Sequence, residues 1–311
     1  MTETMRAIIQ NELGGPEVLH PATVDKPAPG IGEVLVRVRA AGVNPADAMN
    51  RQTGVFSGTP PFILGWDVSG VVEATGPGVT LFAPGDEVFG LLPFPGGAGA
   101  YAEFVVAPTR ALALKPDALS HVQAAALPLA GLTAWQALVD TAAVGQGTRV
   151  LITGAAGGVG HLAVQIAAAR GAHVIALTSG ANADLVRSFG ASDVVDYQAT
   201  DFSEAFSDLD VVFDVVGGDY PLRALKTLRA GGTLVSTLPQ SIGAAAAAAR
   251  ELGIRVAGLF VESDRLGLTA LAELAAEHRL VPLIAATYPL DDAATAHATK
   301  HGPGKVVLVG D

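Results

Sequence analysis

The sequence contains no cysteine, and this absence excludes several kinds of chemistry at once. Without thiols the chain forms no disulfide, uses no thiolate nucleophile and builds no zinc site from cysteine ligands. Basic residues are also few, because 19 Lys and Arg stand against 30 Asp and Glu and leave a net charge of −11. No basic run is present, so we expect no nucleic-acid partner.

Long apolar runs are missing as well. No uninterrupted stretch reaches the roughly 18 residues that suggest a membrane helix, and the alanine run Ala244–Ala249 is far shorter. The first ten residues lack the charged-then-apolar pattern of a signal peptide. We therefore expect no membrane association and a cytoplasmic location. With 311 residues, of which half are hydrophobic, the chain is long enough for about two domains with large cores.

The most informative stretch that is present is Val150–Gly160, VLITGAAGGVG. An apolar run leads into a glycine-rich turn, and an unbroken helical pattern follows from His161 to Arg170. Strand, glycine turn and helix together predict a pyrophosphate site, because the backbone can approach the phosphates and the N-terminus of the helix faces their charge. Glycine in a tight turn is the alternative interpretation. The candidate cofactor contacts are Gly154, Ala155, Gly157, Gly158, Val159 and Gly160.

The segments around this turn favour the nucleotide site over a simple turn. Short β-branched runs alternate with helical patterns, which predicts an α/β fold with a doubly wound parallel sheet. The expected strands are Val150–Thr153, His173–Thr178, Val194–Asp196, Leu209–Val216, Thr233–Ser236 and Arg255–Leu259. The expected helices between them are His161–Arg170, Asn182–Phe189, Tyr220–Leu228 and Gly243–Glu251.

Residues 1–120 differ from this middle section, because short β-type runs are separated by Pro- and Gly-rich turns. Short strands separated by turns of this kind predict a compact β barrel or folded sheet. Ser120 is a candidate N-cap for a helical segment that follows, and Thr133–Ala142 predicts a second helix. A last strand is expected at Lys305–Val309, after the nucleotide-binding sheet.

The sequence resembles the zinc-independent quinone oxidoreductases (zeta-crystallin-like) of the medium-chain dehydrogenase/reductase superfamily. The matching motifs include PGIGEVLVRVRAAGVNPAD at 29–47, GWDVSGVV at 65–72, AALPLAGLTAWQAL at 125–138, GAAGGVGHLAVQIA at 154–167 and GPGKVVLV at 302–309. The resemblance implies a GroES-like catalytic domain at 1–120, to which 286–311 return, and a Rossmann domain at 121–285. It also implies a homodimer.

The cofactor prediction depends on the end of the second expected strand. An NAD site usually has an acidic residue there for the ribose hydroxyls, whereas this chain has Thr178 and Ser179. NADP is therefore favoured, and the resemblance implies that Ser179 and Tyr197 lie against the 2′-phosphate. Relatives often carry a lysine where this chain has Asn182, and Arg187 is either a substitute or a solvated side chain.

The zinc ligands of related dehydrogenases are missing from the first domain. By resemblance, Asn44 stands where the first ligand, a cysteine, would be, and Gly65-Trp66-Asp67 occupies the stretch that would hold a histidine. We therefore predict no metal. Hydride transfer without a Lewis acid requires an acceptor that conjugation already polarises, such as a quinone or an α,β-unsaturated carbonyl.

Further site residues are implied by the resemblance. Asn44 and Asp47 are expected near the nicotinamide and the acceptor. For Asn44 the alternative is a turn residue before Pro45, and the site role is favoured because Asn44 takes the position of a metal ligand in relatives; for Asp47 helix capping is an equally good explanation. Phe56 stands about where some relatives have tyrosine, so we expect the product to be protonated by water or with help from Thr133 through its contact with the cofactor. The remaining expected cofactor contacts are Thr133, Val216, Gly217, Leu238, Phe260, Val261 and Lys305, the last with a surface lysine as its alternative. His297 and His301 are expected on a solvated helix face.

The predicted function is that of an NADPH-dependent, zinc-independent reductase of a small quinone or enone. An enoyl-thioester reductase is one alternative, although no basic cluster for a coenzyme A phosphate is visible. The second alternative is a low-turnover NADPH-binding redox sensor.

Overall fold

The computed structural model describes residues 3–310, which fall into two compact units. Unit 1 contains the residues up to Leu132, Glu262–His278, and the residues from Pro282 onward. Unit 2 contains Thr133–Val261 and Arg279–Val281. We describe each unit by itself.

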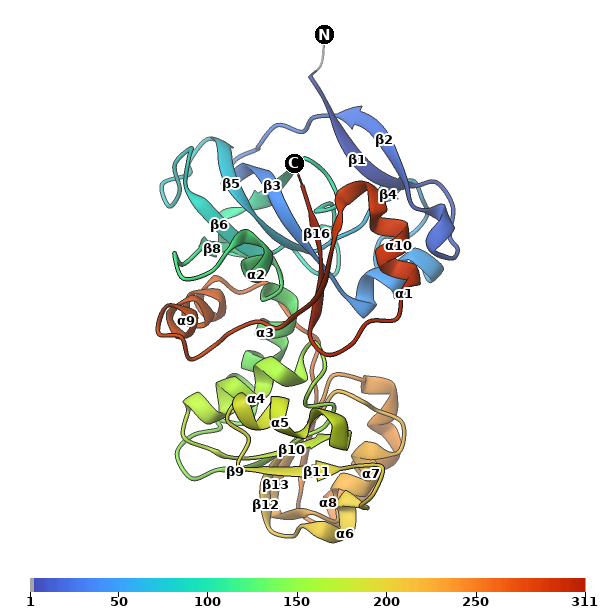
Figure 1. Cartoon of the computed structure of the whole chain (residues 1–311), viewed down its shortest axis with the longest axis vertical. Helices are drawn as coiled ribbons and strands as arrows, with labels where there is room; N and C mark the ends of the chain where they lie inside the picture. The colour runs from blue at the N-terminus through green and yellow to red at the C-terminus, as the bar shows by residue number, and fades with distance from the viewer. Residues whose placement is uncertain (1–2, 311) are drawn as a thin grey trace. The chain divides into compact units, whose positions relative to one another are not determined.

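Unit 1 consists mainly of antiparallel strands (Figure 1). Its larger sheet has the order β15-β16-β3-β5-β6-β8, with β7 also paired to β3, and its smaller sheet has the order β2-β1-β4. The strands are β1 (Thr4–Gln10), β2 (His20–Asp25), β3 (Glu33–Val43), β4 (Phe62–Ile63), β5 (Asp67–Thr75), β6 (Glu87–Leu91), β7 (Phe104–Pro108), β8 (Leu112–Leu114), β15 (Ile284–Pro289) and β16 (Lys305–Val309). Its helices are α1 (Pro45–Thr53), α2 (His121–Ala125), α9 (Arg265–Ala276) and α10 (Ala293–Ala298), and α3 (Pro128–Trp135) begins in this unit.

Strand β3 is central to the larger sheet, because both β16 and β5 pair with it in antiparallel register. Val43 lies opposite Val306, and Gly42 lies opposite Asp67. In an antiparallel sheet the end of one strand lies beside the beginning of its neighbours. The register therefore brings the end of β3 together with the first residues of β5 and β16, which lie far apart in the sequence.

Two helix beginnings in unit 1 follow from local sequence. Ser120 begins α2 as predicted, because its hydroxyl accepts the Gln123 N–H at 3.2 Å while the Gln123 side chain accepts the Ser120 N–H at 3.0 Å. At α1, Asn44 is the N-cap, Pro45 takes the first helical position, and the Asp47 carboxylate accepts the Asn44 N–H at 2.8 Å. Gly54 ends α1 in the left-handed conformation, with φ of 65°.

Unit 2 contains a six-stranded parallel sheet with the order β11-β10-β9-β12-β13-β14. The strands are β9 (Arg149–Ile152), β10 (His173–Thr178), β11 (Asp193–Asp196), β12 (Leu209–Asp214), β13 (Leu228–Ser236) and β14 (Arg255–Gly258). The helices are α4 (Gly160–Ala169), α5 (Ala183–Ser188), α6 (Phe202–Ala205), α7 (Tyr220–Ala224) and α8 (Gly243–Glu251). This order confirms the predicted doubly wound sheet, with the change in winding direction at β9.

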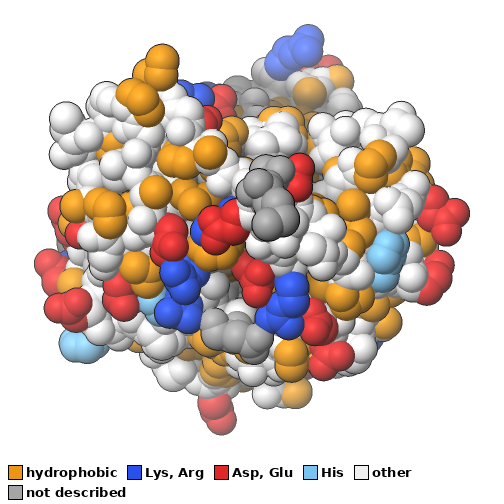
Figure 2. Space-filling model, turned by 90° about the horizontal axis from the view of Figure 1, so that it is seen from above, with side chains coloured by type: hydrophobic (Ala, Val, Ile, Leu, Met, Phe, Trp, Pro, Cys, Tyr) orange, Lys and Arg blue, Asp and Glu red, His pale blue; other side chains and the backbone are white. Residues whose placement is uncertain are grey.

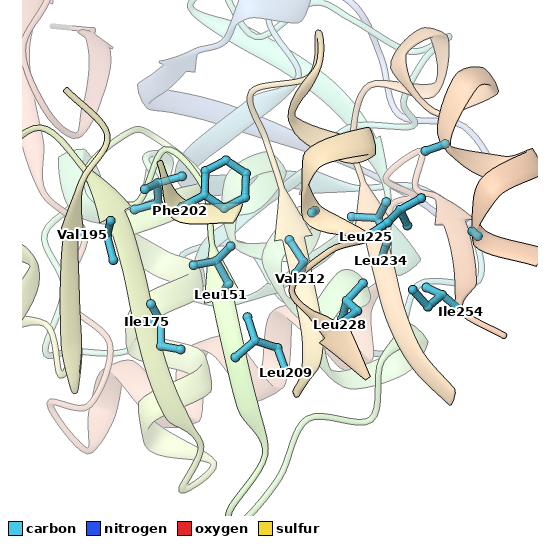
Figure 3. Close-up of a cluster of buried hydrophobic side chains, with 14 residues drawn as sticks. Leu151, Ile175, Val195, Phe202, Leu209, Val212, Leu225, Leu228, Leu234 and Ile254 are labelled. Atoms are coloured by element: carbon cyan, nitrogen blue, oxygen red, sulfur yellow. The ribbon is translucent and has the colours of Figure 1, made fainter. Parts of the chain in front are cut away.

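One face of this sheet is covered by the segments that follow β11, β12 and β13. Leu151, Ile175, Val212 and Leu234 project from the strands into one apolar cluster that also contains Leu225 (Figure 3). The cluster also contains Leu177, Val195, Phe202, Leu209, Ala224, Leu228, Ala245, Ala249 and Ile254. Burial of this apolar surface holds the strands at fixed positions, so that the loops at their carboxyl ends start from a rigid support.

Some predicted boundaries were wrong. The helix expected over Tyr220–Leu228 ends at Ala224, and β13 begins at Leu228 rather than Thr233. The helix expected at Thr133–Ala142 begins earlier, at Pro128, and continues as a π-helix over Gln136–Thr141. The compact units are a separate division of the chain, in which α2 packs on β3 and β5 and α9 packs on β8, and the domain boundaries expected at residues 120 and 286 stay predictions.

Candidate functional site

Unit 1 holds a buried polar cluster where β3, β5 and β16 meet. Asn44, Asp67 and Lys305 are each at least nine-tenths buried. The Asn44 side-chain amide donates from Nδ2 to Asp67 Oδ2 at 2.9 Å, and the Lys305 ammonium donates to Asn44 Oδ1. Asp67 Oδ1 accepts the Leu129 N–H at 2.7 Å. The three side chains therefore form one hydrogen-bonded group.

Asp47 lies next to this group on α1 and is fully buried. Its two carboxylate oxygens accept backbone N–H groups, from Asn44 at 2.8 Å and from Gly65 at 3.1 Å. Burial raises the pKa of Asp47 to about 7, and the charge of Asp67 acts in the same direction. Burial likewise raises the pKa of Asp67, although Lys305 and the Asn44 amide counteract this effect. The predicted capping role of Asp47 is confirmed, whereas its role toward the acceptor stays a prediction.

Aromatic rings pack beside the sequence Gly65-Trp66-Asp67. The rings of Phe56 and Phe94 each contact Trp66, with centroid separations of 5.8 and 5.1 Å. Trp66 is fully buried, and its indole N–H has no hydrogen-bond partner within residues 3–310. A cavity of about 500 Å³ in unit 1 is lined by Phe56, Phe62 and their neighbours. Phe56 thus packs among rings and, as predicted, offers no phenolic proton.

A zinc ion does not fit the residues of unit 1. Zinc requires three or four Cys, His, Asp or Glu ligands, and the described part of the chain contains no such group of three. Asn44 and Asp67 stand where the family resemblance places metal chemistry, but their oxygens accept from the positively charged Lys305. A second cation beside this ammonium would be repelled.

The glycine turn of unit 2 has the geometry expected for a nucleotide site. Gly154 has φ of +58°, and a Cβ on Gly160 would lie 2.1 Å from the Gly154 carbonyl oxygen. Only glycine therefore allows the beginning of α4 to approach the turn this closely. No residue in the described chain accepts the N–H groups of Gly158 and Val159, just before α4. These features fit a dinucleotide pyrophosphate.

The polar residue that organises the other strand ends is Asp214, which the sequence analysis did not select. It is fully buried at the end of β12. Its carboxylate accepts the Thr153 hydroxyl at 2.9 Å and the Ser236 hydroxyl at 2.8 Å, from the ends of β9 and β13. It also accepts the backbone N–H of Gly217. Asp214 therefore fixes the segment that contains the predicted contacts Val216 and Gly217. The feature of the sequence that could have indicated Asp214 is an acidic residue inside the apolar run LDVVFDVV.

The adenosine end of the expected site contains an acid that the prediction missed. Asp196 ends β11 opposite Thr178, and its Oδ2 would lie 2.6 Å from a Cβ placed on Gly180. Ser179 accepts a hydrogen bond from Asn182 at 3.1 Å, and Tyr197 is about half exposed. Arg187, considered as a phosphate ligand, instead pairs with Asp184 at 2.9 Å. The carboxylate comes from the next strand, so a search along β10 alone could not find it.

The other predicted residues have varied surroundings. Thr133 is buried in α3, Ala155 and Val261 are buried, Phe260 is about half exposed, and Leu238 is partly buried after β13. The alternative interpretation of Lys305 as a surface lysine was wrong, since its side chain is only 5% exposed. The prediction that His297 lies on a solvated helix face was wrong, because its ring nitrogens lie 3.0 Å from an Arg51 nitrogen and 3.0 Å from the Tyr101 hydroxyl oxygen.

Comparisons with known proteins agree with this geometry. Residues 30–117 match the family model of the alcohol dehydrogenase GroES-like domain, and residues 189–308 match that of the zinc-binding dehydrogenases. The rat quinone oxidoreductase is 34% identical over 97% of this chain and 96% of its own length. The chain belongs to the quinone oxidoreductase family of the medium-chain dehydrogenase/reductase superfamily.

A solved structure and a second relative extend this result. The quinone oxidoreductase from Coxiella burnetii has a TM-score of 0.92, 35% identity and 99% coverage of both chains. The mouse protein named "NAD(P)H oxidoreductase RTN4IP1, mitochondrial" is 33% identical over 89% of this chain and 81% of its own length. In the bovine and human counterparts the match covers 57% and 52% of the relative. The chain is therefore an oxidoreductase with a GroES-like and a Rossmann fold.

Proposed function

We propose that this oxidoreductase reduces a small quinone or α,β-unsaturated carbonyl with NADPH and without zinc. The observation that carries the proposal is the polar group of unit 1, in which the Asn44 amide, the Asp67 carboxylate and the Lys305 ammonium are hydrogen-bonded to one another. A group of this kind can orient a carbonyl but cannot polarise it as a metal ion would. Acceptors that are already electrophilic by conjugation fit it best.

The residues that would hold the cofactor are those of the glycine turn and the neighbouring strand ends. The turn from Gly154 to Gly160 offers backbone N–H groups to the pyrophosphate, and Thr178, Ser179 and Tyr197 lie at the strand ends expected to meet the adenosine ribose. When bound, the nicotinamide supplies a hydride. Thr133, Val216, Gly217, Leu238, Phe260 and Val261 stay predicted contacts.

The side chains of unit 1 would position the acceptor. The proposed role of Asn44 is a hydrogen bond to the acceptor carbonyl or the cofactor from the second N–H of its amide. The unpartnered indole N–H of Trp66 is a further donor that a carbonyl compound could reach only after a shift of the surrounding rings. The aromatic side chains near Trp66 favour a flat, conjugated acceptor.

An absorbance assay at the reduced-nicotinamide band tests the proposal. Purified protein is mixed with NADPH or NADH and with a simple quinone, a short enone or an enoyl-coenzyme A thioester. We expect oxidation of NADPH with the quinone or the enone, and a higher kcat/KM than with NADH. A preference for the thioester would indicate an enoyl-thioester reductase. Tight NADPH binding without turnover of any acceptor would indicate a redox sensor and contradict the proposal.

The homodimer and the cellular location remain proposals that rest on family resemblance. No helix within residues 3–310 has the length and apolar character needed to span a bilayer. Both predictions can be checked directly, the first by light scattering of the purified protein and the second by imaging of a tagged chain.

A further inference from the structure

The side chain of Lys305 uses all of its hydrogen-bonding capacity inside unit 1. Its ammonium donates to the Val43 carbonyl at 3.2 Å, to Asn44 Oδ1, and to Asp67 Oδ2 at 3.4 Å. An ammonium group has three N–H bonds, so these acceptors account for all of them. No N–H remains to be donated to a cofactor phosphate or ribose. This geometry argues against the cofactor contact expected for Lys305 from the family resemblance.

The same contacts determine the orientation of the Asn44 amide. The ammonium of Lys305 can only donate, so it selects the amide oxygen, and the carboxylate of Asp67 can only accept, so it selects the amide nitrogen. A half-turn of the amide would place its NH₂ against the ammonium and its oxygen against the carboxylate. Both contacts would then be repulsive, so Asn44 is held in one orientation.

The backbone is shaped to hold this arrangement. A Cβ on Gly42 would lie 2.7 Å from Asp67 Oδ2 and 2.4 Å from the Ala125 carbonyl oxygen, so any other residue would displace the carboxylate. Asp67 is anchored on its other side by the Leu129 N–H at 2.7 Å. Lys305 and Asp67 come from the two strands that flank β3, which places Asn44 between them.

We propose that Lys305 is a positioning residue, which with Asp67 fixes the Asn44 amide so that its second N–H is presented in one direction. The fixed orientation of the Asn44 amide rests on the contacts above. The effect of that orientation on catalysis rests in addition on the proposed reductase function. Asn44 is then the group that meets the acceptor or cofactor, and Lys305 acts only through Asn44.

The test compares Lys305→Arg, Lys305→Met and the double variant Lys305→Met/Asp67→Asn with the wild type. The double variant removes both buried charges together, so it keeps the proposal testable where Lys305→Met alone fails to fold. Lys300→Met, which removes an exposed lysine just before β16, is the matched control. For each variant we would measure thermal unfolding, the Kd for NADPH, and kcat and KM for the acceptor that the wild type reduces best.

We expect the folded double variant to bind NADPH with a Kd within about twofold of the wild type and to lose at least tenfold in kcat. Lys305→Arg should recover part of this loss, and Lys300→Met should match the wild type. A Kd for NADPH weakened more than tenfold would show that Lys305 is a cofactor ligand and overturn the proposal. Unchanged kcat and Kd would overturn it equally.

A measurement that is independent of activity separates this proposal from the proposed function. In NMR spectra, the side-chain NH₂ pair of Asn44, identified by its loss in Asn44→Ala, should be protected from hydrogen exchange in the wild type. Protection should persist in Lys300→Met and disappear in the double variant. Equal protection with and without Lys305 would contradict the positioning role, even where no acceptor is reduced.

Discussion

Individual buried polar side chains in this protein have partners that come from distant parts of the sequence. His297 is a clear case, because its Nδ1 faces the Arg51 guanidinium and its Nε2 faces the Tyr101 hydroxyl. A guanidinium only donates, so Nδ1 must be unprotonated and Nε2 carries the hydrogen that Tyr101 accepts. Burial and the charge of Arg51 lower the pKa of His297 to about 4.

This lowered pKa predicts a pH-dependent stability. Between pH 6.5 and about 4 the unfolded chain takes up a proton at His297 that the folded chain does not, so stability falls as the pH falls through this window. We expect His297→Gln to be less stable than the wild type by about 1–2 kcal/mol at pH 8, through lost hydrogen bonds. The difference should shrink at pH 5. Urea unfolding at both pH values measures it, and a constant difference would contradict the assignment.

Asp196 gives a second prediction at this scale. Its carboxylate lies beside Gly180 in the segment expected to meet the adenosine ribose, where it would reduce, without abolishing, the preference for a 2′-phosphate held by Ser179 and Tyr197. We expect Asp196→Asn to raise the ratio of kcat/KM for NADPH over NADH by about 2- to 10-fold, the range for a partly screened charge. Asp193→Asn, at the opposite end of β11, is the matched control. An unchanged or lower ratio for Asp196→Asn would place the carboxylate away from the phosphate.

Candidate site residues could be selected from the sequence where one motif contains them, and not where the fold brings them together from distant segments. The glycines of the turn could be selected because their function depends on neighbours within a few residues. Lys305, Asp214 and Asp196 could not be understood in this way, since their partners lie on other strands. Each of these three was either missed or given surroundings that the structure does not show.

The glycine turn and the beginning of α4 are in close contact, and we expect that adding one methyl group at Gly160 would push them apart. Alanine is normally favoured over glycine in a helix by about 1 kcal/mol, but a Cβ on Gly160 would lie 2.1 Å from the Gly154 oxygen. We expect Gly160→Ala to be destabilised by about 1–3 kcal/mol and its Kd for NADPH to weaken at least tenfold. Calorimetric titration and thermal unfolding measure both.

Gly145→Ala is the control for this prediction, because a Cβ there meets no atom within 4 Å. It should keep the cofactor affinity of the wild type. If Gly160→Ala bound NADPH as tightly as Gly145→Ala does, the turn would not be the pyrophosphate site.

Elements with a strong pattern of their own were predicted, and elements fixed by tertiary contacts were not. The strands of the parallel sheet are continuous β-branched runs, so all six were expected near their observed places. Strand β8 has only three residues and was missed, because pairing with β6 rather than local pattern defines it. Helix α7 ends early because Leu228 is already needed as the first residue of β13.

At the scale of the whole molecule, each unit supplies a different part of the proposed chemistry. Unit 2 has the sheet and glycine turn of a nucleotide site, and unit 1 has the buried Asn44, Asp67 and Lys305 group. On the face shown in Figure 2, acidic and basic side chains lie next to one another and form no continuous basic patch. This mixture, together with the net charge of −11, fits a small acceptor better than a large anionic one.

The central claim is that the whole protein transfers a hydride from NADPH to a conjugated acceptor without a metal. The most direct test counts NADPH consumed and acceptor reduced in one anaerobic sample, before and after treatment with a zinc chelator. The account predicts one NADPH oxidised for each quinone or enone reduced, at a rate that chelation leaves unchanged. The absence of acceptor reduction, or an activity that chelation removes and zinc restores, would contradict it.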